Sequence, residues 1–386
     1  MHTFRTPASP LAGAMLALSL AACGGSAASS PAASAPVAAS SPPVAAPSVA
    51  AKPASAAPAS ASVATKPSAA ASAAASAQAA AGAPKVTVVY NAVATPYLPL
   101  WIGKEAGIFQ KNNLNVDPQV LSGASNSMAA LLSNQAQVFQ AGGSDVLNAV
   151  VGGADLVIVG TMAPTYPYLF EAQADIKTVT DLKGKKIGIG SIGDTSDIAT
   201  RLVLQKAGMD PDKDVSIVAV GNPQTRTTAM LSGAIQATMD SPPDTLTLED
   251  KGMHSILDAA ALKLPASNQA IAVQRSWLNA NKPVLQRYVD SLVEAAAKGK
   301  ADKDYAIGVM KTYLKTDDMR ALNNAYDFAV NENIAVLPYP KPEQYQDAIA
   351  ILSKTNPKLT GFDVTKILDD EFVASAAQRG LDKSAS

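Results

Sequence analysis

The chain has 386 residues, with 31 Lys and Arg against 32 Asp and Glu and a formal net charge of −1. The first 84 residues hold no Asp or Glu and only three cations, so the remainder carries 28 cations against 32 acids, a net charge of −4. A stretch without a basic surplus is poorly suited to neutralise a phosphate backbone, which argues against nucleic acid as a partner.

Cysteine and histidine are too few for several common kinds of site. The only cysteine is Cys23, and the two histidines are His2 and His254. A disulfide within the chain and a cysteine-ligated metal site are therefore excluded, and a Ser-His-Asp triad or multi-histidine zinc site has almost no material. We expect no metal, no cofactor and no catalytic residue, and we interpret His254 as an ordinary surface or core residue.

Residues 1–23 are typical of an export signal. Arg5 gives a positive start, and residues 11–20 form an apolar run that is too short to span a bilayer. Residues 20–23 (Leu-Ala-Ala-Cys) resemble the lipobox of bacterial lipoproteins, which implies cleavage before Cys23 and its acylation; an ordinary signal peptide is the alternative. The expected location is extracytoplasmic, in the periplasm or at the cell surface, with the lipid bilayer as a partner through the acylated Cys23.

Residues 24–84 consist almost wholly of Ala, Ser, Pro and Val. Such a segment has no large apolar side chains to bury, and its prolines interrupt any long helix, so we predict a disordered tether. Treated as a flexible coil, it would span on the order of 40 Å.

From residue 85 onward, short apolar runs alternate with longer amphipathic ones, which predicts crossover units around a mainly parallel sheet. The predicted strands of the first set are 86–90, 114–120, 138–141 and 156–160. The predicted helices run from Thr95, as N-cap, to Gly107, over 125–134, and onward from 142–144.

A second set follows residues 181–186. Its predicted strands are 187–190, 215–220, 237–240 and 256–259, its helices are 196–207 and 222–232, and 271–274 is a return strand. The chain after Trp277 is helical by pattern, most clearly over 283–297. We therefore predict a first part of lobe 1 over 85–177, lobe 2 over 178–270, and a return to lobe 1 with C-terminal helices over 271–386. Ligands of such sheets bind beyond the carboxyl ends of the strands, here in a cleft between the lobes.

Several segments resemble one known family. Residues 101–109 (Trp-Ile-Gly-Lys-Glu-Ala-Gly-Ile-Phe) resemble the W-I-A-K-E-x-G-Y-F segment of the nitrate/sulfonate/taurine-type binding proteins, a family that includes thiamine-pyrimidine synthases. Further matches lie at 156–160, 182–188 and 231–237. The resemblance implies an α/β fold of the periplasmic-binding-protein type II, two lobes with a ligand cleft, a small-molecule solute as ligand, and an ABC permease in the cytoplasmic membrane as partner. A monomer is expected.

The candidate ligand-binding residues follow predicted strand ends. They are Asn91, Thr95, Tyr97, Ser144, Asp145, Thr161 and Tyr166 in lobe 1, and Ser191, Asp194, Thr195, Ser196, Asn222 and Asp240 in lobe 2. Each has a structural alternative, because strand-end loops also cap helices and form turns.

Three positions carry a chemical implication or an alternative of their own. Asp145 suits the positive end of a helix dipole, but if it faces the cleft it implies an amine or another hydrogen-bond donor on the solute. Tyr168, like Tyr166, is a candidate either to line the cleft or to cover the sheet. Arg226 is interpreted as a solvated ion-pair partner on a helix.

Residues 188–193 match G-x-G-x-x-G, the dinucleotide-binding fingerprint. That fingerprint also needs an acidic residue at the end of the next strand, and the chain has Val220-Gly221-Asn222 there. We therefore interpret this loop as part of the cleft.

The sequence thus predicts an exported solute-binding lipoprotein of an ABC importer rather than an enzyme. Two alternatives stay open: an enzyme similar to the thiamine-pyrimidine synthases, and a ligand-sensing subunit of a signalling system. The enzyme alternative lacks the cysteine-rich run and histidine motif of those synthases, because no cysteine follows Cys23 and His254 lies in no matching motif.

Overall fold

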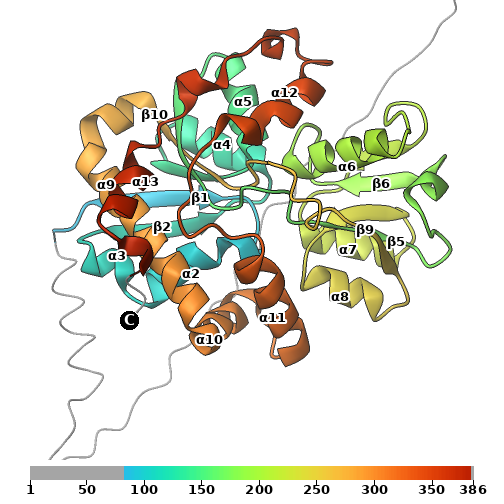
Figure 1. Cartoon of the computed structure of the whole chain (residues 1–386), viewed down its shortest axis with the longest axis horizontal. Coiled ribbons are helices and arrows are strands. Elements are labelled where there is room, and N and C mark those ends of the chain that lie inside the picture. The colour runs from blue at the N-terminus through green and yellow to red at the C-terminus, as the bar shows by residue number, and fades with distance from the viewer. Residues whose placement is uncertain (1–81, 384–386) are drawn as a thin grey trace, which may run out of the picture. The chain divides into compact units, whose positions relative to one another are not determined.

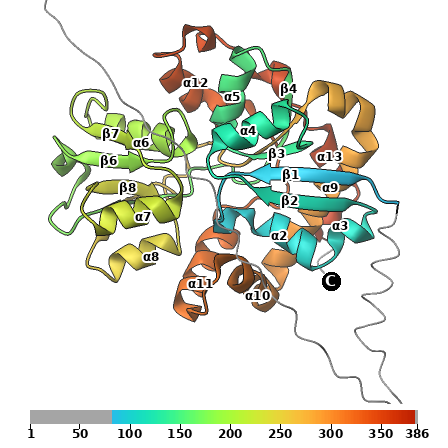
Figure 2. The ribbon, with the colours of Figure 1, turned by 180° about the vertical axis from the view of Figure 1, so that it is seen from behind.

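A computed structural model describes residues 82–383. The predicted signal sequence, Cys23 and all of the predicted tether except its last three residues lie outside these residues. The described part forms two α/β lobes, each built around a five-stranded sheet (Figure 1). Figure 2 shows the same two lobes from behind, with β1 and β2 in front in one lobe and β6 and β8 in the other.

Sheet 1, the core of lobe 1, has the strand order β2-β1-β3-β10-β4. Its strands are β1 (Lys85–Tyr90), β2 (Asn115–Val120), β3 (Val138–Ala141), β4 (Leu156–Thr161) and β10 (Ala270–Gln274). β1 is parallel to β2 and β3, whereas β10 is antiparallel to β3 and β4. One reversed strand in an otherwise parallel sheet is the arrangement expected when the chain leaves for a second lobe and returns.

Helices cover both faces of sheet 1, because its strands are apolar on both sides. Val86 and Val88 of β1 belong to one apolar cluster and Val89 to another, as the alternation of a strand requires. The helices of lobe 1 are α2 (Leu98–Glu105), α3 (Ile108–Lys111), α4 (Ala124–Leu132), α5 (Gly143–Val151), α9 (Arg275–Ala301), α10 (Lys303–Leu314), α11 (Met319–Tyr326), α12 (Gln346–Leu352) and α13 (Glu371–Gln378).

Sheet 2, the core of lobe 2, has the strand order β7-β6-β8-β5-β9. Its strands are β5 (Leu169–Ala172), β6 (Lys186–Ile189), β7 (Ser216–Ala219), β8 (Ala237–Asp240) and β9 (His254–Asp258). The helices of lobe 2 are α6 (Thr195–Lys206), α7 (Pro223–Leu231) and α8 (Asp244–Glu249). β5 is the reversed strand, since it is antiparallel to β8 and β9 while β6 is parallel to β7 and β8.

The two faces of sheet 2 differ in chemistry. Phe170, Ile187 and Met239 belong to the apolar cluster that also contains Ile198 of α6. The alternate strand residues Glu171 and Thr238 are fully buried and belong to none of the apolar clusters. Lobe 2 therefore has one apolar face and one face with buried polar side chains.

Two segments join the lobes, residues 162–168 after β4 and residues 259–269 before β10. Helix α12 adds a third connection, because it packs against both α5 of lobe 1 and α6 of lobe 2. The three connections lie together, because Tyr166, Ala266 and Ala348 line one small cavity with residues of α5 and α6, so they form a candidate hinge.

The structure differs from the predicted elements at several points. The predicted helix from Thr95 is a 3-10 turn η1 (Thr95–Tyr97) followed by α2, and Ala94 rather than Thr95 precedes its first residue. The second sheet starts before the predicted boundary at residue 178, since β5 pairs with β8 and β9. The chain over 335–341 is not helical, because Pro338 and Pro340 cannot continue a helix and the Pro338 carbonyl accepts a hydrogen bond from Thr161 N.

Among residues 82–383, no helix combines the length and the apolar character that crossing a bilayer would require.

Candidate functional site: a polar cavity between the lobes

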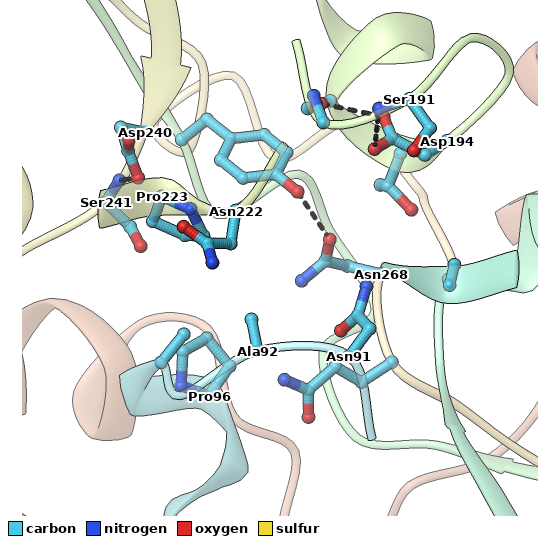
Figure 3. Close-up of a pocket in the computed structure, with 18 of the residues that line it drawn as sticks. Asn91, Ala92, Pro96, Ser191, Asp194, Asn222, Pro223, Asp240, Ser241 and Asn268 are labelled. Atoms are coloured by element: carbon cyan, nitrogen blue, oxygen red, sulfur yellow. Dashed lines mark hydrogen bonds between the residues drawn. The ribbon is translucent and has the colours of Figure 1, made fainter. Parts of the chain in front are cut away.

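A cavity of about 110 Å³ lies where the two lobes meet. Figure 3 shows that Asn91, Ala92 and Pro96 approach it from lobe 1 while Ser191, Asp194, Asn222 and Asp240 approach it from lobe 2. The first turns of α5, α6 and α7 contribute Asp145, Thr195 and Pro223 to its wall, so the cavity sits at three helix N-termini. Both lobes must therefore be together for this site to be complete.

A tyrosine–asparagine pair forms the lobe 1 wall. The Tyr97 hydroxyl donates a hydrogen bond of 2.6 Å to Asn91 Oδ1, and the Tyr97 ring packs on Tyr90 with 4.9 Å between centroids. Burial raises the pKa of Tyr97 well above its ordinary value, so the hydroxyl keeps its proton and remains a donor. These contacts fix the end of β1 and orient Asn91 toward the cavity.

A second pair of the same kind comes from the two segments that join the lobes. The Tyr168 hydroxyl donates to Asn268 Oδ1 at 2.8 Å, and this bond crosses the middle of Figure 3. The neighbouring Gln269 is 2% exposed, and its Oε1 accepts no hydrogen bond from the described residues. The hinge segments thus contribute an aromatic ring and an unused acceptor to the cavity.

The loop before α6 is organised by Asp194. Its carboxylate accepts hydrogen bonds from Ser191 N at 2.7 Å, Ser196 Oγ at 2.7 Å and Asp197 N at 2.9 Å. An aspartate at the N-cap stabilises the unpaired N–H groups of a helix start, so the role of Asp194 is structural as well as cavity-lining. Gly193 has a φ of 83°, which the turn into α6 requires and which favours glycine.

A buried ion pair supports the lobe 2 wall. Arg226 Nη2 lies 3.3 Å from Asp240 Oδ2, and both side chains are at most 5% exposed. Arg226 also donates to Thr238 Oγ1, the Gly221 carbonyl and the Met239 carbonyl. Burial raises the pKa of Asp240, and the nearby guanidinium opposes that rise. The guanidinium is therefore largely occupied in holding the end of β8 and the turn before α7.

Asp145 is the carboxylate with the fewest partners in the cavity. Its Oδ2 is shielded from solvent and accepts no hydrogen bond from the described residues. Burial, together with the negative charge of Asp194, raises the pKa of Asp145 well above the ordinary value of an aspartate. A carboxylate in this position either holds a proton or receives a donor from a ligand.

Two hydrogen bonds join the lobes beside the cavity. Thr95 Oγ1 donates to the Pro242 carbonyl at 3.3 Å, and Gln224 Nε2 donates to the Val93 carbonyl at 3.5 Å. Elsewhere around the cavity the lobes approach so closely that only glycine fits without a shift: a Cβ added to Gly142 of lobe 1 would lie 2.7 Å from Thr195 Oγ1 of lobe 2. The lobes are thus in contact around the cavity, which is a closed arrangement.

The structure brings most of the sequence-predicted residues together. Nine of the candidates line this cavity: Asn91, Tyr97, Asp145, Ser191, Asp194, Thr195, Ser196, Asn222 and Asp240. Four do not line it. Ser144 and Tyr166 line a smaller cavity beside Tyr345, Thr161 is fully buried 3.1 Å from Ser267 Oγ, and Thr95 joins the lobes.

The sequence misplaces Arg226 and gives little indication of several other lining residues, Asn268 and Gln269 among them. Arg226 was interpreted as a solvated helix residue, but it is 4% exposed because α7 turns it toward sheet 2. Asn268 and Gln269 lie in the irregular segment before β10, where no periodicity marks an element. Their polar types immediately before an apolar return strand were the only available signal.

The described residues show no metal site, and His254 lies outside the cavity. Residues 82–383 contain no group of three or more His, Cys, Asp or Glu side chains suited to hold a metal ion. His254 is half-buried on β9 and is not among the residues that line the cavity.

Comparison with known proteins gives a consistent result. The sequence model described as NMT1/THI5 like matches residues 94–304, which is more than half of the chain. A protein of Brucella abortus (strain 2308) that is named a putative binding protein is 26% identical over 219 residues, which cover 56% of this chain and 67% of the relative.

Two solved structures resemble the chain in three dimensions. A protein from Bordetella bronchiseptica RB50 has a TM-score of 0.67 and 22% identity, and the match covers 77% of this chain and 98% of that protein. The periplasmic aliphatic sulphonate binding protein SsuA from Escherichia coli has a TM-score of 0.58 and 18% identity, with coverage of 71% and 88%. The predicted fold, a periplasmic-binding-protein fold of two α/β lobes, is confirmed.

Proposed function

Since the chain belongs to the NMT1/THI5-like family, we propose that it is an extracytoplasmic solute-binding protein that captures a small molecule between its lobes and delivers it to an ABC importer. The observation that carries this proposal is the polar cavity at the lobe interface, lined from both sides. A ligand there contacts both lobes at once, so its binding stabilises the closed arrangement over any open one.

The contacts around the cavity are of the kind that a reversible closure needs. The two interlobe hydrogen bonds beside the cavity, from Thr95 and Gln224, are long at 3.3 and 3.5 Å. A third contact, the ion pair of Arg320 in lobe 1 with Asp250 in lobe 2, lies on the exposed surface, where such pairs contribute little. A single net hydrogen bond contributes only about 1 kcal/mol, so the two hydrogen bonds do not lock the lobes by themselves. A solute that contacts both lobes therefore adds to the free energy of closure.

Attachment and delivery form the second part of the proposal. We propose that Cys23 is the lipidated N-terminal residue of the mature protein and that residues 24–84 tether the two lobes to a membrane. The closed form would then present surfaces of both lobes to a permease in the cytoplasmic membrane. A monomer suffices for this role, because one chain supplies the complete cavity.

Binding without chemical conversion fits the residues of the cavity. Its lining combines carboxylates, amides, hydroxyls, tyrosines and Arg226, and includes no cysteine, lysine or histidine. Asp194 is hydrogen-bonded within its own lobe, and the Arg226 guanidinium does not act as a base, so Asp145 is the one unpaired carboxyl group among the described residues of the lining. We therefore propose that the protein is not an enzyme.

A melting experiment tests the proposal. The full-length chain is heated with each member of a panel of sulfonates, nitrate, amines, amidines, carboxylates and pyrimidines. A ligand at one hundred times its dissociation constant adds about 2.7 kcal/mol, which raises the melting temperature of a domain of this size by roughly several degrees. A shift with any member that disappears in Asn222→Leu supports solute binding, and no shift with the whole panel contradicts it.

A further inference from the structure

The charges that line the cavity are unbalanced. Asp145, Asp194 and Asp240 face Arg226 as the single cationic side chain among the lining residues. Both lobes contribute to the excess, since Asp145 belongs to α5 whereas Asp194 and Asp240 belong to lobe 2. Asp145 and Asp194 also offset the positive N-terminal ends of α5 and α6, so the side-chain charges in this space favour a cation over an oxyanion.

The Arg226 guanidinium is also poorly available to a ligand. Arg226 already donates to one hydroxyl and two main-chain carbonyls and is paired with Asp240. An anionic solute would have to share this guanidinium with a carboxylate 3.3 Å away. Recognition of a sulfonate, nitrate or carboxylate group by Arg226 is therefore disfavoured in this arrangement.

The unused polar atoms point to the same conclusion. Among the residues that line the cavity, two buried side-chain atoms have neither a hydrogen bond nor an ion-pair contact with the described part of the chain: Asp145 Oδ2 and Gln269 Oε1. Asp240 Oδ2 accepts no hydrogen bond but is paired with Arg226. The amide oxygen of Gln269 can only accept, and the carboxyl oxygen can only accept when Asp145 is ionised. Buried acceptors without donors are costly, and a ligand that brings several N–H groups satisfies them.

Resting on the proposed function, we propose that the solute carries a cationic group with several N–H donors, an ammonium, amidinium or guanidinium, and that Asp145 and Gln269 receive it. Tyr97 and Tyr168 also line the cavity, and the faces of tyrosine rings attract organic cations. The ligand class then differs from the one named for the sulphonate-binding neighbour.

Binding of such a cation is expected to release a proton. Burial and the negative charge of Asp194 raise the pKa of Asp145 in the cavity. The other ionisable groups that line the same space are Tyr97, Tyr168 and the Arg226–Asp240 pair. A bound cation favours the ionised carboxylate, so the affinity for a cation rises with pH until Asp145 is ionised in the unliganded protein. An anion that uses the protonated acid gives the opposite slope.

Benzamidinium, benzamide and benzoate test the charge preference, because they share one planar skeleton and differ in charge. Calorimetry on the full-length chain at neutral pH is expected to give benzamidinium at least tenfold higher affinity than the other two. Its affinity should increase with pH, and its binding heat should depend on the ionisation enthalpy of the buffer.

Three variants assign the effect to the cavity. Asp145→Asn is expected to lower benzamidinium affinity at least tenfold and to abolish the pH slope, while Gln269→Leu lowers the affinity and keeps the slope. Asp317→Asn is the matched control, since that carboxylate is 92% exposed on the surface. Circular dichroism and melting of each variant establish that it is folded.

The outcomes separate this inference from the proposed function. Tighter binding of benzoate or methanesulfonate than of benzamidinium, no benzamidinium binding at tens of millimolar, or an unchanged preference in Asp145→Asn would overturn the cationic class. In those cases a stabilising solute elsewhere in the melting panel still supports solute binding. Failure of every solute would overturn both.

Discussion

The face of sheet 1 that α2 and α9 cover and the face of sheet 2 that α7 and α8 cover differ in their side chains. The first buries a large apolar cluster that includes Trp101, Phe109 and Tyr288. The second buries only Met230, Ile235 and Leu248 as an apolar cluster, beside Glu171, Arg226 and Thr238. On this face lobe 1 is thus stabilised by apolar burial, whereas lobe 2 buries ionisable groups, of which Arg226 forms part of the cavity wall.

The largest effect is expected from the apolar side of this comparison. Phe109 is 1% exposed, and its ring stacks on Tyr288 with 5.8 Å between centroids. Phe109→Ala removes these contacts and leaves a void, which should lower the free energy of unfolding by about 3 to 5 kcal/mol. Chemical denaturation measures the free energy of unfolding, and Val120→Ala, at a half-exposed position, is the control. If Phe109→Ala loses no more stability than the control, lobe 1 does not depend on this core.

The buried ion pair gives the next effect. Arg226→Leu leaves Asp240 buried without its cation, which should cost about 3 kcal/mol of unfolding free energy. The double variant with Asp240→Leu should recover much of the loss, because no uncompensated charge remains. Equal denaturation curves for the single and double variants would contradict the role assigned to the pair.

Glu171 should make stability depend on pH. Burial, with smaller effects of Glu249 and Asp240, raises the pKa of Glu171 from 4.5 to about 8. The folded chain therefore retains a proton that the unfolded chain releases, so the free energy of unfolding falls as pH rises from about 4.5 to about 8.

Glu171→Gln removes this titration. We expect the variant to be more stable than the natural chain at pH 8, by about 4 kcal/mol, and nearly equal to it at pH 4.5. Denaturation at both pH values measures the difference. Glu343→Gln, on the exposed surface, provides the control, and a pH dependence that survives in Glu171→Gln would assign it to other groups.

The smallest effect should come from the contact between the lobes. Thr95→Val removes the hydrogen bond to the Pro242 carbonyl, worth about 0.5 to 1.5 kcal/mol, and keeps the shape of the side chain. The affinity for the best-binding solute of the panel should fall about two- to tenfold, with little change in the stability of either lobe. An unchanged affinity would show that this bond does not contribute to closure.

The sequence predicts the fold more fully than the site. Apolar periodicity located β1, β3, β4 and α6 within a residue or two, because their side chains alternate or repeat around buried faces. It missed β5 and α8, since β5 carries Glu171 at its centre and α8 is only six residues long. A buried carboxyl group such as that of Glu171 interrupts the run of apolar residues by which a buried strand is recognised in a sequence.

For the candidate site, position along the chain was informative but side-chain direction was not. Strand-end loops led to Asn91, Asp194 and Asn222, which line the cavity. Nothing local distinguishes them from Thr161, which follows the same rule and faces Ser267 and Tyr345 in the interior. Gln269 lies in an irregular hinge segment, and only the three-dimensional path of the chain brings it to the cavity.

The distance between the lobes, with and without a solute, tests the account most directly. Spin labels at Ser133→Cys in lobe 1 and Thr228→Cys in lobe 2, in a Cys23→Ser background, report this distance, and both sites are exposed. Without solute we expect a broad or double distribution, and with saturating benzamidinium a single population at the distance of the closed arrangement. The same distribution in both conditions, while calorimetry shows binding, would contradict a clamp that closes on its solute.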